Sequence, residues 1–114
     1  MNRMNVNPDQ DQIDIKVEVR VFANLRDLTQ FKKNFYIIKK GDTIGALLQD
    51  IARSLPQSQK FLQEIIDFSE PIPILRKYFK VILNGRILFT EQALNTPIVK
   101  DNSVVAIFPP IGGG

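Results

Sequence analysis

The sequence predicts a single α+β domain, in which a mixed sheet of about four to five strands packs on one main helix. At 114 residues the chain has the length of one compact domain. Apolar and polar residues alternate along 13–21, which is typical of a strand with one buried face. Apolar residues recur at helical spacing along 44–55. We expect the domain at 13–108, between a flexible tail at 1–12 and an extended tail at 109–114.

The first half of the domain combines two strands and the helix. A β-branched and aromatic run at 35–38 follows the strand at 13–21 after a long polar loop, which favours an antiparallel hairpin. The helix at 44–55 begins at Thr43, whose side chain suits an N-cap, and Pro56 closes it.

Residues 56–77 form an elaborated connection between the two halves. Apolar residues along 61–68 indicate a further helical segment within it. Pro71 and Pro73 then oppose both helix and sheet, because proline has a fixed φ and no N–H to donate.

The second half is predicted to contain three strands and no helix. Residues 78–83 form a strand that turns at Asn84–Gly85, a pair that favours the positive φ angles of a tight hairpin turn. A short return strand at 86–89, a polar connection at 90–101 and a last strand at 103–108 complete the chain. This order of elements fits a ubiquitin-like β-grasp.

Composition excludes several classes of function. The chain has no cysteine and no histidine, so disulfides, thiolate nucleophiles, sulfur metal sites and serine–histidine or cysteine–histidine hydrolases are excluded. The net charge is +3, but the bases form scattered doublets at Lys32–Lys33, Lys39–Lys40 and Arg76–Lys77, so we expect no nucleic-acid partner. The sequence has no apolar run long enough for a membrane span and no secretory signal, so we expect a cytoplasmic protein.

The C-terminal end has an unusual composition. Gly112, Gly113 and Gly114 follow Phe108-Pro109-Pro110-Ile111 directly. A floppy terminus is one explanation. The other is a tail that enters a narrow slot, since six residues reach about 20 Å, prolines stiffen the base, and glycines have no Cβ to clash.

The tail ends in a carboxylate, which needs activation before it can react. The chain offers no means of doing so: it has neither the P-loop motif nor the GxGxxG motif. We therefore expect the chain to bind no cofactor or metal, and an activating partner to use ATP. The Gly114 carboxylate is the one reactive group, and the protein is not catalytic alone.

Two aromatic residues indicate a docking surface near this tail. Phe22 continues the polar face of the first strand, and Phe108 ends the last strand. They either form an exposed apolar patch for a partner or fold over the end of the sheet into the core.

Four segments together resemble one known family. They are VFANLRD at 21–27, GDTIGALL at 41–48, VILNGR at 81–86 and DNSVVAIFPPIGGG at 101–114. They resemble the MoaD family, the small sulfur-carrier subunit of molybdopterin synthase, and related small archaeal modifier proteins. The resemblance covers roughly 13–55 and 78–114, while the polar N-terminal extension and the longer segment at 56–77 depart from the family pattern.

The resemblance implies both a chemistry and a set of partners. A MoeB-like adenylyltransferase, similar to ubiquitin-activating enzymes, would adenylate Gly114, which would become a thiocarboxylate and donate sulfur in molybdopterin biosynthesis, within the MoaE-like large subunit. Gly113 would be its partner in the motif. The residues implied in partner binding are Phe22, Arg26, Ile87, Phe108, Pro109, Pro110, Ile111 and Gly112.

Three other hypotheses use the same fold. A ubiquitin-like protein modifier would join its C-terminal glycine to lysines of other proteins. A thiamine-pathway carrier resembling ThiS shares the terminal glycines but usually lacks the Phe-Pro-Pro segment at 108–110. A β-grasp binding module with an inert tail would lose nothing on removal of the glycines.

Overall fold

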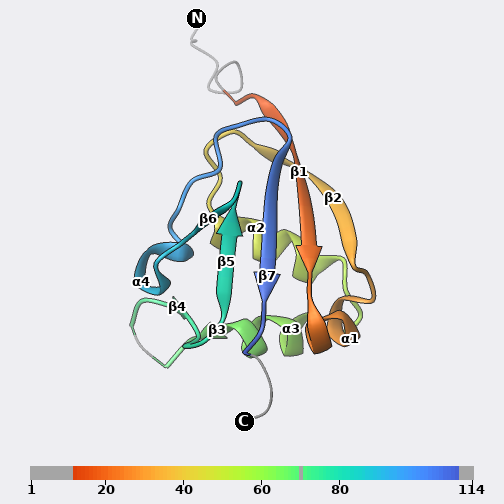
Figure 1. Cartoon of the computed structure of the whole chain (residues 1–114), viewed down its shortest axis with the longest axis vertical. Coiled ribbons are helices and arrows are strands. Elements are labelled where there is room, and N and C mark those ends of the chain that lie inside the picture. Colours follow the sequence, from red (N-terminus) through yellow and green to blue (C-terminus); the bar gives the residue numbers. More distant parts are fainter. Residues whose placement is uncertain (1–11, 70, 111–114) are drawn as a thin grey trace, which may run out of the picture.

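Figure 1 shows the computed structural model, which describes residues 12–69 and 71–110. The predicted N-terminal tail, apart from Gln12, lies outside the described residues. Residues 111–114, which include the three terminal glycines, also lie outside them.

The structure has a five-stranded mixed sheet, as predicted from the sequence. Its strands lie in the order β2-β1-β7-β5-β6. The neighbours β1 and β7 run parallel, and the other three pairs are antiparallel. The strands are β1 (Asp14–Val21), β2 (Lys33–Lys39), β5 (Lys80–Leu83), β6 (Arg86–Ile87) and β7 (Ser103–Phe108).

Each central strand buries one of its two faces. In β1 the apolar residues of the predicted parity are buried: Ile15, Val17, Val19 and Val21. Ile13, predicted to begin this face, is 55% exposed and precedes the strand, which begins at Asp14. In β7 the buried pair is Val105 and Ile107, so the parity of Phe108 faces the other way. The apolar core therefore lies on one side of the sheet.

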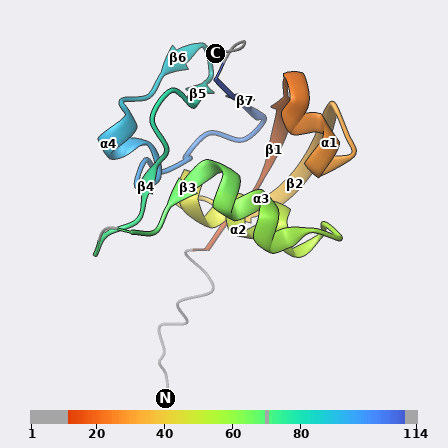
Figure 2. The same ribbon diagram turned by 90° about the horizontal axis from the view of Figure 1, so that it is seen from below.

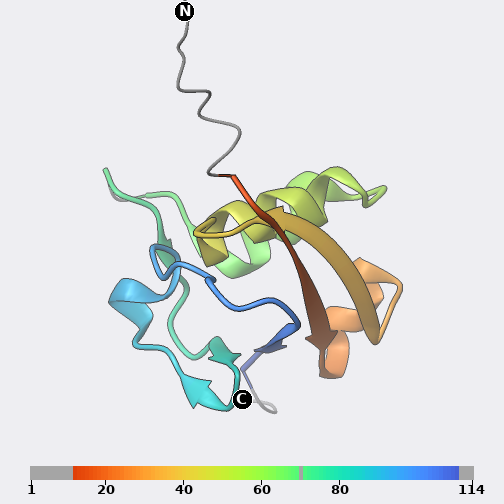
Figure 3. The same cartoon turned by 90° about the horizontal axis from the view of Figure 1, so that it is seen from above.

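Two helices cover this buried face (Figures 2 and 3). The main helix α2 (Ile44–Arg53) is capped as predicted, because Thr43 Oγ1 accepts a hydrogen bond from the Ala46 N–H at 3.1 Å. The second helix, α3 (Ser58–Ile65), packs against α2 and buries Phe61 completely.

The connection at 56–77 contains more regular structure than the sequence predicted. The helical segment expected along 61–68 ends at Ile65. Ile66–Asp67 (β3) then pairs antiparallel with Ile74–Leu75 (β4) in a separate two-stranded sheet. Ile66 is buried, so its apolar side chain serves a strand rather than a helix face.

Three further features differ from the prediction: one loop contains helical turns, and two strands have other boundaries. The long loop after β1 contains a 3₁₀ turn, η2 (Ala23–Leu25), and a short helix, α1 (Arg26–Thr29). The strand expected at 78–83 begins only at Lys80, and the return strand expected at 86–89 ends at Ile87.

The connection at 90–101 is not simply polar. It contains the short helix α4 (Thr90–Ala93), and Ala93, Leu94 and Ile98 are buried. Figure 1 shows α4 on the β5–β6 side of the sheet. The segment after it is bonded to the start of α2 and the turn before it, because the Leu94 carbonyl accepts from the Gly45 N–H and the Ile98 carbonyl accepts from the Gly41 N–H.

Candidate functional site: an open sheet face beside the C-terminal tail

The face of the sheet away from α2 and α3 carries an apolar cluster at the end where β7 stops. We call it the open-face patch, and define it by five residues: Phe22, Ile82, Ile87, Ala106 and Phe108. The strand register places them side by side. In β5, Ile82 pairs with Ala106 of β7 on one side and with Ile87 of β6 on the other.

Phe22 and Phe108 form a stacked pair within the open-face patch. The Phe22 N–H donates to the Ile107 carbonyl at 3.2 Å, so the hydrogen bonding between β1 and β7 reaches the residue after β1. The two rings stack with centroids 4.1 Å apart and an angle of 9° between their planes. Both residues are half-buried. They therefore shield each other on the open face instead of folding into the core.

Arg26 lies over this pair and is held there by the backbone. Its Nε donates to the Val21 carbonyl at 2.8 Å, and its guanidinium carbon lies 5.5 Å from the centroid of the Phe22 ring. This distance is within the range of a cation–π contact. The arginine predicted from the sequence for a polar rim thus lies at the edge of the aromatic pair.

Ile87 lies at the other end of the open-face patch. It is 60% exposed, which is high for an isoleucine in a strand, and it belongs to the edge strand β6. Its place follows from the Asn84–Gly85 turn, in which φ is 50° and 84°, as predicted for this hairpin.

Basic residues border the open-face patch. Arg20 is the register partner of Ala106, and Lys80 is the register partner of Phe108. Glu18 forms an ion pair with Arg20 and reduces the local positive charge. Together with Arg26, these bases favour a partner with carboxylates around an apolar contact.

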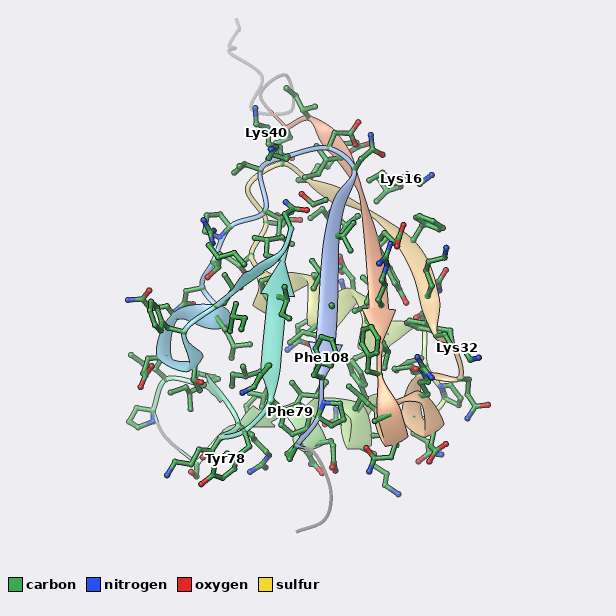
Figure 4. All side chains as sticks on the ribbon, in the orientation of Figure 1. Lys16, Lys32, Lys40, Tyr78, Phe79 and Phe108 are labelled. Carbon is green, nitrogen blue, oxygen red and sulfur yellow. The ribbon has the colours of Figure 1, made fainter. Side chains whose placement is uncertain are left out.

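The base of the tail begins at this patch (Figure 4). Strand β7 ends at Phe108, and the two prolines follow. Pro109 is buried within the domain, whereas Pro110 is exposed. Only Pro110 therefore offers surface to a partner, and the role expected for Pro109 in partner binding stays a prediction. The roles expected for Ile111, Gly112, Gly113 and Gly114 fall outside the described residues.

Sequence reasoning missed part of this site. The register of the Asn84–Gly85 hairpin places Ile82 opposite Ile87, and the pairing of β5 with β7 places Lys80 opposite Phe108. The hairpin signal alone does not reveal this second pairing. Ala106 joins the site because it lies on the same face of β7 as Phe108. Within residues 12–69 and 71–110, no group of three or more acidic side chains could hold a metal ion. No helix in the same residues is long and apolar enough to cross a membrane.

Comparison with known proteins supports the same class of protein. Residues 19–114 match the ThiS family. The chain is 28% identical over 101 residues to small archaeal modifier protein 3 of Haloferax volcanii, an alignment that covers 88% of this chain and 100% of that protein.

Two solved structures share the fold. Small archaeal modifier protein 1 from Methanosarcina acetivorans superposes with a TM-score of 0.66 at 23% identity, over 90% of this chain and 99% of that one. A Pyrococcus furiosus protein, described as a candidate molybdopterin converting factor subunit 1, gives a TM-score of 0.58 at 24% identity, over 85% and 99%. Both likenesses establish the ubiquitin-like β-grasp fold. The family match covers most of the chain, and we conclude that this protein belongs to the ThiS family of ubiquitin-like proteins.

Proposed function

We propose that this protein is a sulfur carrier whose C-terminal Gly114 is activated by a partner enzyme. The observation that carries the proposal is the position of the open-face patch. Its stacked pair, Phe22 and Phe108, lies where β7 ends, and the segment Pro109-Pro110-Ile111 and the glycines follow directly. A partner that holds the patch would thereby hold the base of the tail, so that the terminal carboxylate reaches its reaction centre in a limited set of positions.

The chemistry proceeds in two steps at the C-terminus of this chain, within the active site of the partner enzyme. The Gly114 carboxylate attacks the α-phosphorus of ATP, and pyrophosphate leaves as the acyl-adenylate forms. Sulfide from a donor then displaces AMP, which converts the terminal carboxylate into a thiocarboxylate. The carrier contributes the carboxylate and its presentation, while ATP binds to a MoeB-like activating enzyme.

Molybdopterin biosynthesis is the pathway we propose for the sulfur. The Phe-Pro-Pro-Ile segment before the glycines supports it, because this segment resembles the MoaD family more than thiamine-pathway carriers. The Pyrococcus furiosus structure, with its description as a converting factor subunit, agrees with this choice. The receiving partner would be a MoaE-like large subunit that accepts the tail and bears the pterin.

Protein modification is a second candidate function. The full-length match to a small archaeal modifier protein favours it. In this case the ε-amino group of a lysine attacks the acyl-adenylate carbonyl of Gly114, AMP leaves and the nitrogen loses a proton, so that an isopeptide bond forms in place of a thiocarboxylate. Both functions require the same activation step.

An adenylation assay tests the shared step. We expect the protein to support ATP–pyrophosphate exchange by the activating enzyme of the same organism, and deletion of Gly113 and Gly114 to abolish exchange with an unchanged urea melt. Deletion of residues 1–11 is the matched control and should leave exchange intact. Exchange by the glycine-deleted protein would contradict both functions and leave only a binding module with an inert tail.

A second measurement separates the two functions. When a sulfide donor and the large subunit are supplied, a carrier accumulates thiocarboxylate and delivers sulfur to the pterin. When host proteins are supplied, a modifier produces conjugates of higher mass that depend on ATP. Conjugates without any thiocarboxylate would contradict the sulfur-carrier proposal.

A further inference from the structure

Tyr78 has an unusual backbone conformation for an aromatic residue. Its φ is +72°, in the left-handed region that glycine and asparagine adopt most readily. Five residues other than glycine have a positive φ within residues 12–69 and 71–110, and Tyr78 is the aromatic one among them. Burial of the side chain does little to stabilise this conformation, because the residue is 71% exposed.

The neighbouring residues force this conformation. Tyr78 is the third residue of a turn in which the Phe79 N–H donates to the Arg76 carbonyl at 3.2 Å. Arg76 is held by α3, since its N–H donates to the Ile65 carbonyl at 2.8 Å and its Nε to the Gln63 carbonyl at 2.7 Å. Phe79 is buried at the other end of the turn. The turn is therefore fixed at both ends, and glycine would fill its third position with less strain.

Tyr78 lies at the same end of the sheet as the proposed docking surface. Lys80 is the register partner of Phe108, and this is the last pair between β5 and β7. Tyr78 lies two residues before Lys80 in the segment that leads into β5, and Pro110 lies two residues after Phe108 in the segment that leaves β7. Figure 4 shows Tyr78 and Phe108 toward the end of the sheet where β7 stops. Tyr78 is therefore two residues from Lys80, which borders the open-face patch.

We infer that Tyr78 is a docking contact for the activating enzyme, an inference that rests on the proposed function. Within the described residues the ring itself contacts only the Lys77 side chain, so its apolar surface stays open to solvent, while a tyrosine presented at an interface adds a large, rigid contact surface. The Lys77 ammonium lies 5.9 Å from the centroid of the Tyr78 ring, and Lys80 follows in β5. The partner site that fits is an apolar slot with carboxylates at its edge. Tyr78 is a binding contact and takes no part in the chemistry.

Two substitutions separate the ring from the backbone strain. Tyr78→Gly and Tyr78→Asn remove the ring and place a residue that tolerates positive φ. We expect both variants to unfold in urea at the same or a higher midpoint than the original protein. We expect both to raise the KM for the carrier in the ATP–pyrophosphate exchange reaction by about 10-fold, with kcat nearly unchanged, since an interface aromatic contributes this much or more.

Two controls accompany these variants. Asn102→Gly changes a positive-φ residue (62°) beside the opposite end of β7, and Phe89→Ala removes a more exposed aromatic ring at the start of α4. We expect neither to change KM. Glycine-deleted protein reports on the proposed function itself.

The outcomes distinguish the inference from the proposed function. If Tyr78→Gly and Tyr78→Asn keep the original KM while glycine deletion abolishes exchange, the docking role of Tyr78 is overturned and the carrier function stands. If either variant unfolds at a clearly lower midpoint, Tyr78 stabilises the fold and the inference is also overturned. If glycine deletion leaves exchange intact, the proposed function fails, and the inference fails with it.

Discussion

Truncation of Phe108 to alanine is expected to weaken partner binding far more than it weakens the fold. Phe108 is half-buried and stacks on Phe22 on the open face, 4.1 Å between centroids. A stacked aromatic pair contributes about 1 kcal/mol beyond the area it buries. We therefore expect Phe108→Ala to lower the free energy of unfolding by about 1–2 kcal/mol, below the roughly 3–5 kcal/mol of a fully buried phenylalanine.

The effect on binding is expected to be larger. An aromatic residue at the centre of an interface typically contributes about 2 kcal/mol or more, which corresponds to a roughly 30-fold weaker dissociation constant. Urea melts measure the first quantity, and calorimetric titration with the large subunit measures the second. Phe22→Ala should behave in the same way, because each ring loses its stacking partner.

Phe35→Ala provides the matched control. Phe35 is also an aromatic residue on the open face, 47% exposed, but it lies on the edge strand β2 under the Lys16 ammonium. We expect this substitution to leave binding unchanged. A loss of 3 kcal/mol or more of stability in Phe108→Ala would show that the ring serves the core, and unchanged stability together with unchanged binding would refute both interpretations of the pair.

Three further predictions concern glycines. Gly113→Val should block adenylation although the terminal carboxylate remains, because a β-branched side chain must pass the slot that bare backbone enters; normal pyrophosphate exchange would show that no narrow channel exists. Gly45→Ala should lower the free energy of unfolding by about 1–3 kcal/mol in urea melts, since the added Cβ would lie 3.0 Å from the Leu94 carbonyl oxygen that accepts from the Gly45 N–H. An unchanged midpoint would mean that the Leu94 backbone shifts away from the new methyl group at no cost. Gly85→Ala has open space around its Cβ and should cost only the strain of φ +84°, about 1 kcal/mol, so a loss near that of a buried residue would contradict the open hairpin turn.

The sheet could be predicted from the sequence because its signals are local. Alternation along β1 identified the buried residues from Ile15 to Val21, and Asn84–Gly85 fixed a hairpin whose two positive φ angles the structure contains. The start of α2 could also be predicted, because the hydrogen bond between Thr43 and Ala46 that caps the helix joins residues only three positions apart. Each of these features depends on residues close together in the chain.

The elements that escaped prediction depend on distant contacts. The helix α4 spans only Thr90–Ala93, too short to show helical periodicity, and it exists because Ala93 and Leu94 close the core. The strands β3 and β4 have two residues each, and only their pairing across Pro71 and Pro73 defines them. Their β propensity alone could not reveal this.

Tyr78 shows the same limit at the candidate site. Its aromatic side chain favours a strand, and the sequence therefore predicts a strand that begins at Tyr78, two residues before β5 begins. The structure places it in a turn because Arg76 is bonded to α3 and Phe79 enters the core. The stacking of Phe22 on Phe108, by contrast, agrees with the patch expected from strand parity, since both residues lie on the face that each strand leaves open.

The chemical state of the C-terminus tests the central proposal most directly. Intact mass spectrometry of the protein purified from its native organism, without reducing or alkylating treatment, measures it. We expect a population of chains in which one oxygen is replaced by sulfur, located at Gly114 by fragmentation and lost after hydrolysis. A terminus found only as the unmodified carboxylate, even in cells that are actively making molybdopterin, would contradict it.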